Sequence, residues 1–335
     1  MGKKNICAII FGPIAMLILI LDTKRAVNGV ASGIDICIRS VIPSLFPFMV
    51  ASSISTHFLL GQQITFLRSI GRLCRIPEGT ESLLLVGLLG GYPTGAKVVH
   101  NAYTSGTISK HDAERMLGFC NNAGPAFIFG ILGSCFTNRA TVWLLWLVHI
   151  LSALIVGILL PGKKQGSGQL RTPQPMSILQ IVEDCGKAML PICLWIIIFR
   201  MITTFLGDWI LFCIPRWCAI TINGMLELTN GCLQLGSIDN EALRIIICTI
   251  ILSFGGICVH IQTSSVTKKL EGKLFFPGKV LQCAISCAIT GIILLLDGNY
   301  KVISFILTSC LLTGFTLTYL SRLQKNSSNL AANGV

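Results

Sequence analysis

The chain has 335 residues, of which 53% are hydrophobic and only 12% are charged, and its mean hydropathy is +0.75. A soluble domain carries about 25% charged residues, so this composition excludes one soluble core and predicts an all-α, polytopic membrane protein. The formal charge is +12, from 26 basic and 14 acidic residues. This excess fits basic cytoplasmic loops or an anionic substrate. Because no aromatic-interleaved basic patch lies outside the apolar runs, we expect no nucleic-acid partner.

Apolar runs recur along the whole chain at about the length of a membrane helix, which is about 20 residues. They predict eight to ten transmembrane segments, at residues 6–21, 41–60, 82–103, 116–136, 141–160, 188–206, 242–263, 280–296 and 302–320. A further apolar stretch, 209–235, is less regular and either crosses the membrane or dips into it.

Two parts of the chain carry the same pattern. An acid, a base and a proline follow one another at intervals of four: Asp35, Arg39 and Pro43, and again Glu183, Lys187 and Pro191. An acid and a base at this spacing share one helix face. We expect each amphipathic segment to lie along the membrane interface and each proline to restart the chain. A glycine pair then interrupts a long apolar run in each part, at Gly90-Gly91 and Gly255-Gly256.

The pattern predicts an internal duplication. Its parts are an N-terminal membrane helix at 1–25, a first repeat at 26–160, a linker at 161–175, a second repeat at 176–320 and a disordered tail at 321–335. The linker is rich in Gly, Pro and basic residues and is expected in the cytoplasm. Two related halves with discontinuous helices are typical of secondary transporters. The spacing leaves the relative orientation of the repeats open.

The first candidate site is the segment Gly90-Gly91-Tyr92-Pro93-Thr94-Gly95-Ala96-Lys97, which cannot continue a regular helix. We expect its backbone N–H groups, with the Tyr92 and Thr94 side chains, to face an anionic substrate where the helix restarts. Lys97 would offset the charge of that substrate. The alternative is that the glycines allow close helix packing and that Lys97 reaches toward the interface.

A second candidate lies in the run 116–136, where Asn121 and Asn122 precede a helix-breaking Gly124-Pro125. Buried amides need partners, so they are expected to bind a carboxylate or ring nitrogen. The alternative is that they only cap the broken helix. The second half supplies the remaining candidates, Glu227, Thr229, Asn230, Gly255, Gly256 and Gln262. A carboxylate in an apolar region is a functional candidate, and Glu227 would bind a coupling cation or proton, or pair with Lys97; otherwise it lies in a loop.

These motifs resemble those of a known family. GGYPTGAK, SKHDAERML and FCNNAGPAFIFG in the first half, with PSLFPF, LELTNG and SFGGICVHIQ, resemble the sporulation integral membrane protein YlbJ family, also called SpoVV, over residues 26–320. The resemblance implies an endospore-forming bacterium, kinship with the nucleoside-recognition Gate-domain transporters, and movement of dipicolinic acid from the mother cell toward the forespore across the outer forespore membrane.

The sequence and the resemblance together predict a transporter of a small organic anion. We expect no enzyme activity, because HExxH, Walker A and GxSxG motifs are missing, and no cofactor or metal site. The expected partners are the anion, the lipid bilayer, a coupling cation or proton, and a second copy of the chain. One alternative is a nucleoside-like carrier of the same fold. The other is a membrane assembly protein for spore cortex formation, which would depend on loop residues such as Lys110 and Arg115.

Overall fold

The computed structural model describes residues 3–59, 67–162, 177–267 and 270–296, and all regular secondary structure in these ranges is helical. The protein is an all-α, polytopic membrane protein. Helical segments long and apolar enough to cross a bilayer number five among the described residues: Thr23–Ser55, Arg139–Leu159, Ile178–Trp209, Glu241–Val266 and Phe275–Leu296. The predicted span 302–320, the tail 321–335 and most of the linker 161–175 lie outside the described residues, so these predictions stay untested.

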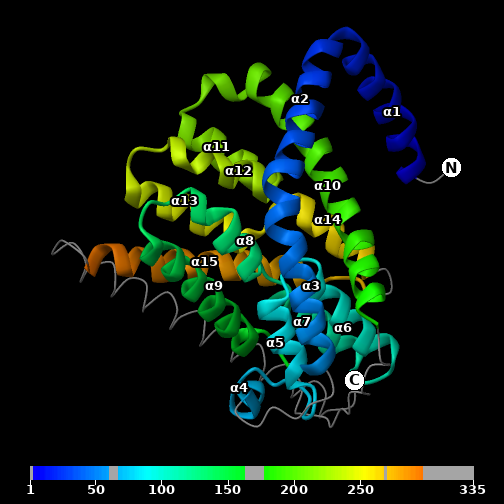
Figure 1. Ribbon diagram of the computed structural model, residues 1–335, viewed down its shortest axis with the longest axis vertical. Helices are drawn as coiled ribbons and strands as arrows, with labels where there is room; N and C mark the ends of the chain where they lie inside the picture. Colours follow the sequence, from blue (N-terminus) through cyan, green and yellow to red (C-terminus); the bar gives the residue numbers. More distant parts are fainter. Residues whose placement is uncertain (1–2, 60–66, 163–176, 268–269, 297–335) are drawn as a thin grey trace.

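The first half follows α1 (Lys3–Leu21) and begins with one long helix (Figure 1). This helix consists of α2 (Thr23–Ile36), a π-helical turn (Cys37–Val41) and α3 (Ile42–Leu59). The short α4 (Leu67–Leu73) and two interrupted helices come next, and an unbroken helix ends the half. These are α5 (Glu81–Leu89) with α6 (Thr94–Thr104), α7 (Lys110–Cys120) with α8 (Pro125–Gly130), and α9 (Arg139–Leu159).

The second half has the same order of elements. A long helix is followed by two interrupted helices and an unbroken one: α10 (Ile178–Trp209), α11 (Arg216–Leu226) with α12 (Leu228–Gln234), α13 (Glu241–Phe254) with α14 (Gly256–Val266), and α15 (Phe275–Leu296). By this order the interruption at Gly255 corresponds to the one between α7 and α8. The sequence match between Gly90-Gly91 and Gly255-Gly256 therefore pairs interruptions that hold different places in the two halves.

The long helices of the two halves correct one prediction. Neither proline restarts the chain in a new direction: the first helix continues through the π-helical turn and Pro43, and α10 contains Pro191. The acid–base pairs thus lie on membrane helices and not on separate interfacial segments. Side by side, α2 and α10 approach closely at two glycines (Figure 1). A methyl group on Gly29 would lie 2.8 Å from Cα of Met201. A methyl group on Gly33 would lie at the same distance, 2.8 Å, from Cα of Ile197.

Apolar side chains cover the outside of the bundle. On α9, Trp143, Leu147 and Leu151 are exposed at intervals of four residues, so they form one apolar stripe on the helix. The opposite side of α9 is buried. Exposed apolar stripes of this kind are unfavourable in water and agree with helices that face lipid.

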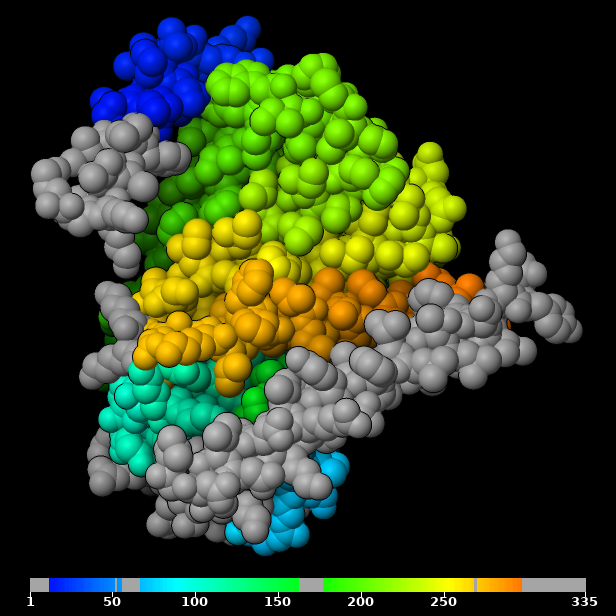
Figure 2. Space-filling view, turned by 180° about the vertical axis from the view of Figure 1, so that it is seen from behind, coloured from blue at the N-terminus to red at the C-terminus, as the bar shows by residue number. Residues whose placement is uncertain are grey.

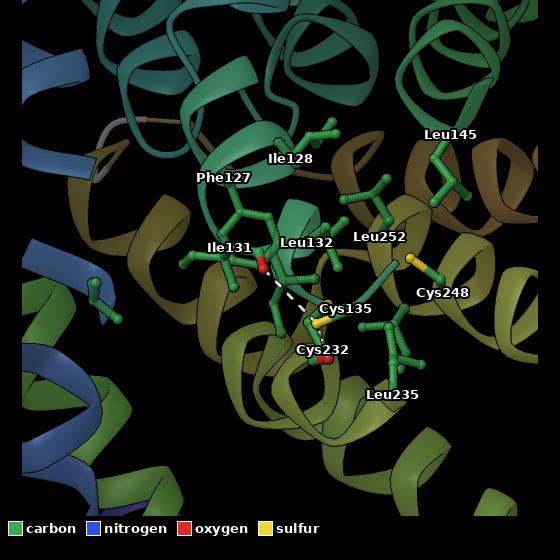
Figure 3. Packing of buried hydrophobic residues seen from close by; sticks show 14 of the residues in the cluster. Phe127, Ile128, Ile131, Leu132, Cys135, Leu145, Cys232, Leu235, Cys248 and Leu252 are labelled. Atoms are coloured by element: carbon green, nitrogen blue, oxygen red, sulfur yellow. Dashed lines mark hydrogen bonds between the residues drawn. The ribbon is translucent and has the colours of Figure 1, made fainter. Parts of the chain in front are cut away.

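The buried core joins the two halves. Residues of α8 and the following turn pack against α12 and α13 (Figure 3), and the thiol of Cys135 donates a hydrogen bond to the carbonyl oxygen of Cys232 over 3.2 Å. On the face opposite to the one seen in Figure 1, α14 and α15 form a band across the middle of the molecule, below α10 and α11 (Figure 2).

Arg115 lies fully buried inside α7 and not in a loop as expected.

Candidate functional site

Four helix interruptions meet at the centre of the molecule. They lie between α5 and α6, α7 and α8, α11 and α12, and α13 and α14. The first two touch, because a methyl group on Gly91 would lie 3.2 Å from the backbone nitrogen of Gly124. The last two touch as well, since a methyl group on Gly256 would lie 3.0 Å from the backbone nitrogen of Leu228. Both halves therefore contribute a pair of interruptions to one place.

A contact between the two pairs closes the arrangement. Gly255, with φ of +84°, is the capping residue between the two helices: it follows the end of α13 and precedes the start of α14. The hydroxyl of Tyr92 lies 2.7 Å from the position of a methyl group on Gly255. A side chain at this residue would be strained by the backbone and would also displace the tyrosine. The tight approach of Tyr92 thus depends on glycine.

A central cavity lies between the four interruptions, with a volume of about 60 Å³. It is lined by the following residues predicted for the site: Gly90, Gly91, Tyr92, Gly124, Glu227, Thr229 and Gln262. Apolar side chains of α3 and α10, among them Met49 and Ile196, close the remaining wall. A mostly apolar cavity with a few convergent polar groups is the usual form of a small-molecule site.

Glu227 brings a carboxylate to this cavity. It is 3% exposed and caps α12, because its two oxygens accept hydrogen bonds from the backbone nitrogens of Thr229 (3.1 Å) and Asn230 (2.7 Å). Next to it, the side-chain amide of Asn230 is buried, and neither its oxygen nor its nitrogen has a hydrogen-bond partner among the described residues. An unpartnered buried amide costs free energy, so Asn230 has donor and acceptor capacity left for a ligand or water.

Asn121 holds three helices together. Its side-chain oxygen accepts a hydrogen bond from the backbone nitrogen of Ala96 over 3.2 Å, and its nitrogen donates to the hydroxyl of Thr263 over 2.8 Å. The residue thereby joins α6, the end of α7 and α14. Asn121 is bonded within the protein and is absent from the cavity wall. The side chain of Asn121 thus connects other helices, whereas the side-chain nitrogen of Asn122 caps the end of α7 by donating to the carbonyl oxygen of Phe119 over 2.6 Å.

Asn122 belongs to a buried polar network that the sequence did not reveal. Its side-chain oxygen accepts hydrogen bonds from the ammonium group of Lys279 (3.0 Å) and the amide of Gln282 (3.1 Å). Gln282 also donates to the backbone oxygen of His149 over 3.2 Å, and the imidazole of His149 accepts from the backbone nitrogen of Ala123 over 3.2 Å. The network links the interruption after α7 to α9 and α15. It also reaches the wall of the central cavity, because the residue that donates to His149, Ala123, lines that cavity.

The structure places the other predicted residues away from the cavity. Lys97 is exposed, so in this structure it does not offset a charge inside the site. Gly95 packs against the carbonyl oxygen of Cys120. The backbone nitrogens of Gly90 and Gly95 already donate to Val86 and Gly91, which leaves fewer free N–H groups than expected. Thr94 does not line the cavity, and the same is true of Gly255 and Gly256. Both glycines, however, contact residues that line it.

The comparisons with known proteins agree with the motifs. No family model matches the chain, and no solved structure matches it significantly. The chain is similar to the sporulation integral membrane protein YlbJ of Bacillus subtilis (strain 168), with 25% identity over 75% of this chain and 73% of that protein. The resemblance drawn from the motifs is confirmed, and the chain is a membrane protein related to a sporulation protein.

Proposed function

We propose that the chain carries a small organic anion across the membrane. The observation that supports this most is the meeting of four helix interruptions, two from each half, around one internal cavity. In lipid, irregular backbone is tolerated only where it is buried in protein or lines a cavity. Secondary transporters place their substrate sites where such interruptions meet. The same order of elements in both halves supports a carrier built from two repeats.

The proposed substrate is dipicolinate, moved from the mother cell toward the forespore across the outer forespore membrane. The relative is named as a sporulation protein, and the motif family implies this compound. Its chemistry suits the site in two ways. A flat aromatic ring can stack on the ring of Tyr92 in the cavity wall, and the buried ammonium group of Lys279 lies 5.4 Å from the centroid of the same tyrosine ring.

Glu227 suggests that a cation or proton accompanies the anion. A carboxylate in the wall of a small cavity repels an anionic ligand, and this repulsion is strong where water is scarce. A proton or metal cation on Glu227 removes the repulsion. We therefore propose coupled movement of the anion with a proton or a cation, with Glu227 as the group that binds it.

The test is uptake of labelled dipicolinate into proteoliposomes that contain the purified protein, with and without proton and sodium gradients. We expect saturable uptake above that of empty liposomes, increased by one of the gradients. A matched pair of variants connects uptake to the interruptions. Gly124→Ala places a methyl group 2.8 Å from Cα of Gly91 and should lower uptake strongly, whereas Gly133→Ala meets no atom within 4 Å and should behave like the native protein.

Three outcomes would contradict the proposal or the site assigned to it. Folded protein that takes up uridine but not dipicolinate would indicate a nucleoside-like carrier. Folded protein that takes up neither compound under any gradient would shift the function to membrane assembly during sporulation. Uptake by Gly124→Ala that equals native uptake would separate transport from the central cavity.

A further inference from the structure

Lys279 is a buried lysine that forms no ion pair with the residues that the structure describes. Its side chain is fully buried near the start of α15, and its ammonium group donates hydrogen bonds to the neutral oxygens of Asn122 (3.0 Å) and Gln282 (2.9 Å). The ion pairs found among the described residues involve other lysines. Removing a charge from water is costly unless an opposite charge compensates it. In a membrane helix such a residue marks a functional site.

The ammonium group lies close to the central cavity. It is 5.4 Å from the ring centroid of Tyr92, a residue that lines the cavity. The hydrogen-bonded Asn122 is followed directly by Ala123 and Gly124, which also line it. Tyr92 therefore lies against both the ammonium group and the space where the proposed substrate binds.

A second cavity, with a volume of about 240 Å³, lies beside the start of α15. Its walls include His260, Thr263, Phe275 and Phe276, and Lys279 follows one helical turn after the two phenylalanines. On α14, Gln262 faces the central cavity and the next residue, Thr263, faces the second one.

Contacts connect the two cavities without a gap. Tyr92 packs on Gly255. The adjacent Phe254 stacks with its ring 5.0 Å from His260 and 6.1 Å from Phe276, measured between centroids. These contacts lead from Tyr92 in the wall of the central cavity to His260 in the wall of the second one, and Lys279 lies beside Tyr92.

We propose that Lys279 is the counter-charge that a carboxylate substrate meets as it passes between the two cavities, and that Tyr92 is the movable side chain that covers it. The inference rests on the proposed transport of an anion and assigns its charge recognition to this residue. When Tyr92 moves aside, a carboxylate replaces the neutral acceptors around the ammonium group. A lysine with neutral partners suits this exchange, because no ion pair with the described part of the chain has to be broken.

The experiment measures both binding and uptake for Lys279→Gln, Lys279→Arg and the control Lys24→Gln, which changes an exposed lysine in α2. The probes are dipicolinate and its uncharged dicarboxamide. Lys279→Gln should weaken dipicolinate binding by about 10- to 100-fold, the usual loss when a hydrogen bond to a charged group is removed. Its affinity for the dicarboxamide should stay at the native value. Lys279→Arg should keep most of the preference for the dianion, and the control should match the native protein.

A measurement on the native protein alone covers the case in which Lys279→Gln does not fold. The affinity should decrease from dipicolinate to the monocarboxylate to the dicarboxamide, because each step removes a charge but retains the ring. Equal affinity for all three compounds would overturn the inference. A purely structural role of Lys279 predicts lower stability of the Gln variant with an unchanged ratio of affinities.

The outcomes distinguish the inference from the proposed function. Native protein that binds carboxylates but does not move them overturns transport and the passage between the cavities, and the affinities of Lys279→Gln then decide whether Lys279 recognises the charge. Native uptake combined with undiminished dipicolinate binding by Lys279→Gln overturns the inference and leaves transport standing. Native protein that neither binds nor moves a carboxylate overturns both.

Discussion

Glu271 accepts a hydrogen bond from the ammonium group of Lys110 over 2.6 Å, and this contact joins the loop before α15 to the start of α7. Lys273 forms a second ion pair with the same carboxylate, also at 2.6 Å. The backbone nitrogen of Glu271 donates to the carboxylate of Glu114 over 3.1 Å. The two halves are thus connected by an exposed polar cluster beside the second cavity.

This cluster predicts a defined dependence on pH. The hydrogen bonds from Lys110 and Lys273 lower the pKa of Glu271 to about 2, from about 4.3 in an unfolded chain. A lowered pKa contributes stability that is complete above the unfolded value and is lost as the pH falls toward the folded value. The stability difference between native protein and Glu271→Gln should therefore be constant above about pH 6 and shrink between about pH 5 and pH 2.

Thermal unfolding in detergent at several pH values measures this difference. Because the groups are exposed, the difference should be small and should decrease with added salt. A difference that grows on acidification would contradict the assignment. Glu78→Gln is a suitable comparison, since Glu78 pairs with Arg72 at 3.6 Å elsewhere on the surface.

The close packing of α2 on α10 predicts a large effect of a small substitution. Gly33→Ala places a methyl group 2.8 Å from Cα of Ile197, which is backbone and cannot turn away. Overpacking of this kind costs about 1–3 kcal/mol. Gly186→Ala in α10 meets no atom within 4 Å and should be neutral or raise stability by up to about 1 kcal/mol, because alanine favours the helix. Equal unfolding temperatures of the two variants would show that the helices do not pack as described.

Arg115 predicts a second effect on stability. Its guanidinium donates to the carbonyl oxygens of Gly157 over 3.1 Å and of Arg75 over 2.6 Å, while its side chain is fully buried. Arg115→Met leaves both oxygens without this donor and should lower the free energy of unfolding by at least about 2 kcal/mol. Arg139→Met, on an exposed residue of α9, should change it by no more than about 0.5 kcal/mol. Denaturant titration of both variants provides the comparison.

Glu227→Gln tests the proposed coupling. Glutamine keeps one oxygen for the cap of α12 but cannot take up a proton or balance a metal cation. We expect uptake that no longer responds to the gradient that drives the native protein. Asp35→Asn, which removes a carboxylate from the exposed ion pair with Arg39, should retain the native response. A gradient response that persists in Glu227→Gln would assign coupling to another group.

Composition and local backbone chemistry determined which features could be predicted. The apolar content predicted the helical membrane fold, and the Gly and Pro residues around Gly91 and Gly124 predicted two interruptions, because such residues end helices wherever they occur. The interruption between α11 and α12 has no such signal. It depends on Glu227, whose carboxylate caps the second helix, and the sequence showed only that this residue was a carboxylate in an apolar region.

The buried cation was missed for a physical reason. Lys279 directly precedes the predicted span 280–296 and therefore falls outside it, whereas α15 begins at Phe275 and includes it. Conversely, Lys97 follows a glycine-rich segment and was expected in the site, yet it is exposed. Which side of a short helix faces inward is determined by packing between distant segments, here through Gly95 against Cys120. A single sequence does not contain this information.

The size of the central cavity affects how any affinity should be interpreted. A volume of about 60 Å³ holds about four water molecules, which is too little for an aromatic dicarboxylate. Binding of such a ligand would require a wider cavity, for example through separation of Gly91 from Gly124 or of Gly256 from Leu228. The measured dissociation constant then equals the intrinsic constant divided by the fraction of molecules already expanded. Substitutions that favour the expanded form would tighten binding without touching the ligand.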